Sequence, residues 1–213
     1  MRTNTLRTFV SHGFVFDNLK EIEIVPSLDH VGRSSWRVNF DIYRCEDRDK
    51  KLIANVLTTM VATNDDHDRS VSLPNRDVLK TLVAETKPFT MLEFVRPYPS
   101  PSFSVWYSYV RQTDCDSLGH VNNSIYPLLC EEARSYGLVS GEYRGKAKTL
   151  ASCPTSFCQV SYINQAKPFE PLCITSHLVD EEHFHFEVVS ADVVVAEVIV
   201  GVDTTDLTGK SNI

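Results

Sequence analysis

The sequence predicts an α+β protein built from antiparallel sheets in two related halves. Three observations support this fold class: paired segments in which apolar residues alternate with polar ones, one long amphipathic helical segment, and a proline-rich break between the halves. Alternation with a period of two indicates a strand with one buried face, whereas apolar residues three and four apart indicate a helix. The 213 residues are enough for one large domain or two small ones.

The first half ends in a hairpin pattern. Residues 35–44 (SWRVNFDIYR) alternate apolar and polar side chains, and a charged turn leads to a returning strand at residues 52–63. Residues 21–25 form a shorter strand candidate, and residues 75–84 read as a short helix. We therefore expect a sheet with one buried face in this half.

Four prolines and weak periodicity mark residues 85–104 as a linker, because proline fixes an extended backbone and removes a hydrogen-bond donor. We expect a degenerate or truncated N-terminal domain at residues 1–84, this linker, and a C-terminal domain at residues 105–213.

The second half carries the long helix and most of the strands. We expect strands at residues 105–111, 151–163, 172–179, 183–189 and 193–203, with a basic connection at residues 143–148. The helix is expected at residues 124–138, and its predicted core-facing residues are Ile125, Leu128, Leu129, Ala133 and Tyr136.

The two halves show a faint internal repeat. The hairpin SSWRVNFDIY…LIANVLTTMVAT is matched by EEHFHFEVV…VVVAEVIVGVDT, with Ala54 and Ala196 in corresponding places. A repeated supersecondary unit favours two fused, similar domains, although two ordinary hairpins could coincide by chance.

Composition limits the classes of function. Residues 161–213 hold nine acidic and two basic side chains, which accounts for the net charge of −7 and argues against nucleic acid binding. No apolar run is long enough for a membrane span, and we expect no secretory signal because no apolar run follows the N-terminal arginines. Six scattered cysteines suggest free thiols in a reducing compartment. We expect a cytoplasmic protein, with a mitochondrial location as the alternative suggested by Arg2 and Arg7.

Residues 111–126 (RQTDCDSLGHVNNSIY) concentrate the groups that could perform chemistry. Asn122 or Asn123 is a suitable N-cap, and the unpaired N–H groups of a first helical turn favour an oxyanion. Asp116, just ahead of that turn, could attack a polarised carbonyl or activate water. A capped helix whose acids only complement the helix dipole is an equal alternative from these residues alone.

The stretch DCDSLGHVNNSIYPLLCEEAR resembles hotdog-fold thioesterases of the 4-hydroxybenzoyl-CoA type, and HVNN is similar to the double-hotdog plant acyl-carrier-protein thioesterases. The resemblance implies a double hotdog with an incomplete first copy, in which each antiparallel sheet wraps around a central helix. It also implies a cofactor-free thioesterase acting on acyl-CoA or acyl-carrier protein, and it leaves a homo-oligomer open. Because the motif occurs once, we expect one site per chain.

The resemblance also implies roles for individual residues. Asp116 is the expected catalytic carboxylate, and the backbone N–H of Asn123 is expected to polarise the carbonyl. His120 matches the catalytic histidine of the plant enzymes. The residues expected to bind substrate are Gly119, Asn122, Tyr126 and Gln165.

Three positions depart from the plant pattern. Leu118 replaces their catalytic asparagine, Gln165 stands near their downstream acid, and Pro127 lies in the first helical turn. These departures favour an Asp116-led mechanism. A non-catalytic acyl-thioester-binding protein remains the main alternative, and a hotdog hydratase is a weaker one.

Other polar residues are expected to be structural or exposed. His183 and His185 share a strand face, but the spacing of ligands does not suggest a metal site. We expect Glu131 to be solvated and Arg134 to join a surface basic cluster with Arg144, Lys146 and Lys148.

Overall fold

The computed structural model describes residues 4–10, 21–46, 49–64, 69–83 and 103–205, and the chain divides into two units, residues 2–92 and residues 93–213. The expected linker falls almost entirely outside the described residues; its last two residues, Phe103 and Ser104, lie in a strand. None of the described helices is long and apolar enough to cross a membrane.

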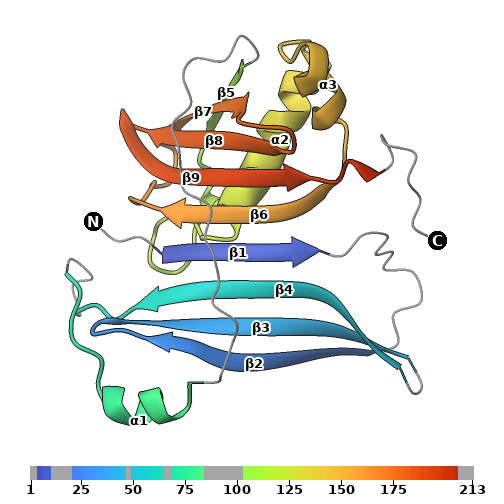
Figure 1. Ribbon diagram of the computed structural model, residues 1–213. Coiled ribbons are helices and arrows are strands. Elements are labelled where there is room, and N and C mark those ends of the chain that lie inside the picture. Colours follow the sequence, from blue (N-terminus) through green and yellow to red (C-terminus); the bar gives the residue numbers. More distant parts are fainter. Residues whose placement is uncertain (1–3, 11–20, 47–48, 65–68, 84–102, 206–213) are drawn as a thin grey trace. The chain divides into compact units, whose positions relative to one another are not determined.

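The first unit is an antiparallel sheet with one short helix. Its strands are β1 (Asn4–Val10), β2 (Glu21–Val31), β3 (Ser35–Glu46) and β4 (Asp49–Val61), in the spatial order β2-β3-β4-β1. Helix α1 (Arg76–Thr81) follows β4 and packs on β2 (Figure 1). The sheet is therefore more extensive than the expected hairpin, and the helix is shorter than expected.

The second unit is a five-stranded antiparallel sheet with a long helix on one face (Figure 1). In chain order it contains β5 (Phe103–Tyr109), the 3-10 turn η1 (Gln112–Asp114), α2 (Ile125–Val139) and α3 (Gly145–Ala151). The remaining strands are β6 (Thr155–Tyr162), β7 (Pro171–Leu178), β8 (His183–Ser190) and β9 (Val193–Val202). Their spatial order is β6-β9-β8-β7-β5.

Helix α2 begins and ends where its sequence dictates. Pro127 is the third helical residue, a position whose N–H would have no partner within the helix, so it is tolerated there. Gly141, with a φ of +75°, follows the last turn and adopts the left-handed conformation that ends many helices. The helix boundaries therefore lie within one residue of those predicted.

The buried face of α2 is rotated from the predicted one. Leu129 and Ala133 are buried as expected, but Leu128 is 59% exposed and Tyr136 is 42% exposed, so these two assignments are wrong. The residues that face the sheet are Tyr126, Leu129, Cys130, Ala133 and Gly137. The small residues on this face allow α2 to approach the strands closely. Leu128 and Tyr136, at helical spacing, had instead suggested a buried face made of large apolar residues.

Two further expectations are corrected. Residues 145–151 form α3 instead of continuing a basic connection, because Ala147, Leu150 and Ala151 are buried at helical spacing. Arg134 is buried rather than part of a surface cluster, and it binds Glu131 along the same helix. Glu131 is therefore an ion-pair partner and not a freely solvated acid.

Candidate active site

The segment between η1 and α2 forms a small hairpin turn. Cys115 and Val121 form an antiparallel bridge, and the N–H of Asp116 donates to the carbonyl oxygen of His120 at 3.0 Å. The N–H of Gly119 donates back to the carbonyl oxygen of Asp116 at 3.1 Å, and Gly119 has a φ of +76°. This is a three-residue hairpin loop whose last position requires the left-handed region, and glycine reaches that region without steric cost.

The turn brings Asp116 and His120 together. They flank the loop as directly paired residues, and paired residues present their side chains on the same face. The distance from Asp116 Oδ2 to His120 Nδ1 is 3.6 Å, and both side chains are partly exposed, at 27% and 20%. The other carboxylate oxygen, Oδ1, accepts the N–H of Leu118 at 2.8 Å. One oxygen of Asp116 is thus held in place while the other faces the imidazole.

The residues before α2 supply both a cap and a donor. Asn122 Oδ1 accepts the backbone N–H of Ser124 at 3.0 Å and its hydroxyl at 2.9 Å. The N-cap of α2 is Ser124, so the prediction of Asn122 or Asn123 as the N-cap is wrong, and Asn122 instead orders the chain just before the cap. Among the described residues, the backbone N–H of Asn123 has no acceptor, although the carbonyl oxygen of Asn123 accepts the Tyr162 hydroxyl at 2.8 Å. The residue that carries this unpaired N–H is therefore held through its carbonyl oxygen.

Hydrogen bonds on both sides of the hairpin turn hold it in place. Asp114 is buried and accepts the N–H and the guanidinium of Arg111 at 3.0–3.1 Å, and its carbonyl oxygen accepts the N–H of Asn122 at 2.9 Å. The N–H of Val121 donates to Ala166 at 3.0 Å. The hydrogen bond and charge of Asp114 raise the pKa of Arg111. Asp114 thus acts as a structural acid, whereas the carboxylate of Asp116 is more accessible.

The other expected binding residues occupy different environments. Tyr126 is 2% exposed and packs its ring 5.7 Å from that of Tyr162, and burial raises its pKa to about 12. Gln165 is exposed and precedes Ala166, whose carbonyl oxygen accepts the N–H of Val121. A Cβ added at Gly119 would meet nothing within 4 Å, so the turn conformation rather than crowding explains this glycine. Tyr126 therefore supports the start of the helix from within the core.

Sequence reasoning missed the residues that hold the loop from a distance. Tyr162, on β6, and Ala166, after it, are about forty residues away from the groups they bind. Neither has a local sequence signal, because strand β6 meets the loop only through the tertiary fold. The alternation of Cys158, Val160 and Tyr162 on β6 identifies Tyr162 as facing α2, but not its acceptor.

Cysteine and histidine side chains were also considered as reactive groups or metal ligands. Burial raises the pKa of Cys115, as do the neighbouring charges of Asp114 and Asp116. The rings of His177 and His185 lie 5.1 Å apart, but no group of three or more potential metal ligands occurs within the described part of the chain.

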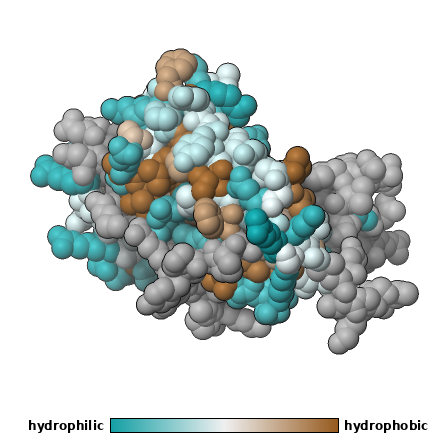
Figure 2. Space-filling model, turned by 90° about the horizontal axis from the view of Figure 1, so that it is seen from above, coloured by the Kyte–Doolittle hydropathy of each residue, from teal (hydrophilic) through white to brown (hydrophobic). Residues whose placement is uncertain are grey.

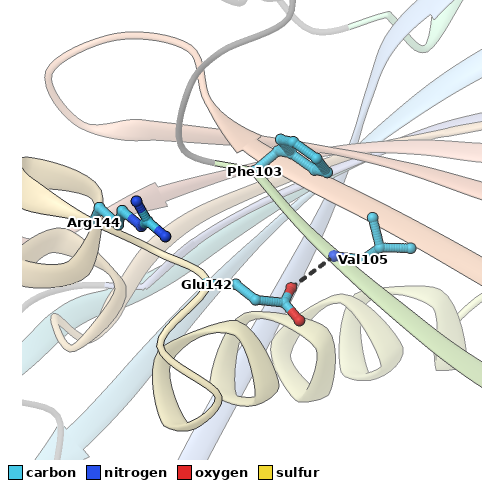
Figure 3. Close-up of a pocket in the computed structure, with 4 residues that line it drawn as sticks. All are labelled: Phe103, Val105, Glu142 and Arg144. Carbon is cyan, nitrogen blue, oxygen red and sulfur yellow. Dashed lines mark hydrogen bonds between the residues drawn. The ribbon is translucent and has the colours of Figure 1, made fainter.

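A separate pocket of about 430 Å³ lies at the other end of β5. Phe103 and Val105 line it from the strand, and Glu142 and Arg144 line it from the segment after α2 (Figure 3). Glu142 accepts the N–H of Val105 at 3.0 Å, which occupies a donor of this edge strand. None of the expected site residues lines this pocket, and the length of β5, about 20 Å, separates the two regions.

The exposed surface of the second unit carries isolated apolar side chains. Phe103, Leu128 and Val139 are among them, at 55%, 59% and 88% exposure. Figure 2 shows hydrophobic atoms gathered in small patches between hydrophilic ones on the face seen from above. Such small patches are ordinary for a protein surface and define no site by themselves.

Comparison with known proteins identifies the second unit. Residues 110–210 match the family model described as the thioesterase-like superfamily. The match covers 101 of the 213 residues of the chain, and these residues are similar to that superfamily. The match begins directly after β5 and includes the Asp116–His120 turn, α2 and all later strands. No curated protein sequence matches the chain.

Solved structures show the fold of the whole chain. An acyl-ACP thioesterase from Bacteroides thetaiotaomicron is similar with a TM-score of 0.69 and 16% identity, covering 94% of this chain and 75% of that one. A 12:0-ACP thioesterase from Umbellularia californica gives a TM-score of 0.69 and 13% identity, covering 94% and 74%. At these identities the similarity shows fold alone. The chain has a double-hotdog fold, and the described residues of its first copy form an incomplete hotdog, with a sheet but no long central helix.

Proposed function

We propose that this protein hydrolyses acyl thioesters at a single site, with Asp116 as nucleophile or general base and the Asn123 N–H as the oxyanion donor. One observation carries the proposal. A partly exposed carboxylate paired with an imidazole lies seven residues before an N–H that has no acceptor among the described residues. The similarity of residues 110–210, which contain the pair, to the thioesterase-like superfamily supports the same class of reaction.

Thioester hydrolysis requires a group that stabilises the negative charge of the carbonyl oxygen and a base that activates water. Attack on a thioester carbonyl places negative charge on its oxygen, and a fixed backbone N–H at a helix start stabilises that charge without reorganising. As general base, Asp116 Oδ2 takes a proton from water while the resulting hydroxide bonds to the carbonyl carbon. The C–S bond then breaks, and the thiolate regains a proton. His120, 3.6 Å from Oδ2, orients the carboxylate and is the nearest group that can carry the proton.

The substrate class is an acyl group on coenzyme A or on acyl-carrier protein. The similar structures include acyl-ACP thioesterases, which supports the second carrier. The Asp116–His120 motif occurs once in the sequence, so we propose one substrate per chain. Titration with a non-hydrolysable acyl-CoA analogue measures this number, and two equivalents per chain would contradict a single site.

Binding without turnover is the competing function. The side chain of Leu118 is 62% exposed and offers no polar group at the tip of the turn, and only its N–H contacts Asp116. A scaffold that binds acyl thioesters would tolerate this apolar residue.

Thiol release decides between the two functions. Purified protein is tested with acyl-CoA and acyl-carrier-protein substrates of several chain lengths, with Asp116→Ala as the control. We expect release by the parent and almost none by the variant. Saturable binding without release from any substrate would favour the binding protein.

A further inference from the structure

The chain just before helix α2 has one backbone N–H that differs from its neighbours. In residues 121–125, four of the five N–H groups donate to oxygens of Asp114, Asn122 and Ala166. The N–H of Asn123, in the middle of this stretch, has no acceptor among the described residues. The placement of Asn123 therefore decides where this stretch can stabilise the negative charge of an oxyanion.

The carbonyl oxygen of Asn123 lacks its usual helical partner. In an α-helix, a carbonyl oxygen accepts the N–H four residues later in the chain. For Asn123 that residue is Pro127, which has no N–H. The residues in between have helical backbone angles, since Ser124 has a φ of −69° and a ψ of −16° and α2 begins at Ile125. Any other residue at position 127 would therefore present an N–H to this oxygen.

Tyr162 supplies the missing donor from strand β6. Its hydroxyl donates to the carbonyl oxygen of Asn123 at 2.8 Å. The side chain is buried, and its ring packs against that of Tyr126 in the first turn of α2. Burial raises the pKa of Tyr162, so the hydroxyl keeps the proton that it donates. The oxygen that Pro127 leaves without a helical donor is thus held by the sheet.

Pro127 also explains where helix α2 begins. The N-cap residue is the one whose carbonyl oxygen accepts the first hydrogen bond within the helix. An N–H at position 127 would make Asn123 that residue, whereas proline moves the N-cap to Ser124. Asn123 therefore lies just outside the helix, held through its carbonyl oxygen, and its N–H is left for a ligand.

We propose that Tyr162 is a positioning residue for the oxyanion donor: it fixes Asn123 through the carbonyl oxygen that Pro127 releases from the helix. This inference rests on the proposed function, in which the Asn123 N–H stabilises the thioester oxyanion. A donor that is already fixed stabilises this charge without moving, and a small displacement of it lowers the rate. The charge develops only in the transition state, so loss of the Tyr162 hydroxyl should lower kcat and leave KM nearly unchanged.

Two buried tyrosine hydroxyls give a matched comparison. Tyr162→Phe removes the bond to Asn123, whereas Tyr143→Phe removes a buried bond to Ser176 beyond the other end of α2. Both variants lose one buried hydrogen bond and should be destabilised similarly in urea unfolding. In thiol release by the folded protein, Tyr162→Phe should lower kcat at least about tenfold, with KM changed less than about twofold. Tyr143→Phe should keep the parental kcat.

Pro127→Ala tests the same carbonyl oxygen by rescue. Alanine restores an N–H four residues after Asn123, so this N–H can replace the lost Tyr162 hydroxyl. Adding Pro127→Ala to Tyr162→Phe should therefore recover kcat by at least about threefold, whereas Pro127→Ala alone should not raise the kcat of the parent. A purely structural role of Tyr162 gives no reason for such recovery.

The outcomes separate this inference from the proposed function. A parent that hydrolyses acyl thioesters while Tyr162→Phe keeps the parental kcat would overturn the role of Tyr162 alone. So would an equal loss of kcat in Tyr143→Phe, or no recovery in the double variant. A parent that releases no thiol from any acyl thioester would contradict the proposed function, and the role of Tyr162 with it.

Discussion

Gly137→Ala should destabilise the second unit although alanine is the better helix former. On an open helix the change stabilises by about 1 kcal/mol. Here the added Cβ would lie 2.6 Å from Ser104 Oγ, 2.7 Å from Ser104 Cβ and 2.7 Å from Tyr143 Cε2. Ser104 Cβ is fixed to strand β5, and the Tyr143 ring is 1% exposed and bonded to Ser176. Overpacking of this kind costs about 3 kcal/mol at the upper end of its range, so a net loss of about 2 kcal/mol is expected.

Urea unfolding followed by far-UV circular dichroism measures this change in the free energy of unfolding. Ser104→Gly removes both Ser104 contacts, so the double variant should recover part of the loss beyond simple additivity. Tyr143 still limits that recovery. If Gly137→Ala were neutral or stabilising, the close approach of the last turn of α2 to β5 would be refuted.

Three further predictions concern the site and the core. Asn122→Ala should cost about 1 kcal/mol through the lost hydrogen bonds to Ser124, measured by urea unfolding, with Asn122→Asp largely preserving stability; equal losses would contradict this role of the side-chain oxygen. Gly119→Ala should cost about 1–2 kcal/mol because its φ is +76°, with Gly119→Asn milder; a neutral alanine would contradict the turn assignment. Burial raises the pKa of Cys158 to about 12 and that of Cys130 well above its usual value. The reactive thiolate is therefore depleted at pH 8.5, and iodoacetamide should label both in urea but not in the folded protein, as followed by mass spectrometry.

The elements that could be predicted from sequence are those whose pattern is local. Alternation along β3 and β8 and the apolar spacing along α2 placed these elements to within a few residues. The turn before α2 was also within reach, since Asp-Ser-Leu-Gly places glycine where a three-residue hairpin loop needs it. Helix α3 has only a weak sequence signal, because Lys146 and Lys148 leave three apolar residues, Ala147, Leu150 and Ala151, to mark its buried side.

Features that depend on distant segments could not be predicted. Arg134 donates to the carbonyl oxygens of Ala151 and Cys153, and this satisfies a buried guanidinium that reads as a surface cation in sequence. The rotation of the buried face of α2 has the same origin. Gly137 and Cys130 face the sheet because β5 and β6 come close to them, and nothing in the helix itself specifies that.

The most direct test of the proposed function compares Asp116→Asn with Asp114→Asn in thiol release. Each loses one negative charge, but Asp116 is the partly exposed member beside His120, whereas Asp114 is buried against Arg111. With folding verified by circular dichroism, Asp116→Asn should lower turnover at least about a hundredfold while retaining binding of a non-hydrolysable acyl-CoA analogue. Asp114→Asn should act mainly on stability, with turnover of the folded fraction largely kept. Hydrolysis by Asp116→Asn at the parent rate would contradict the account.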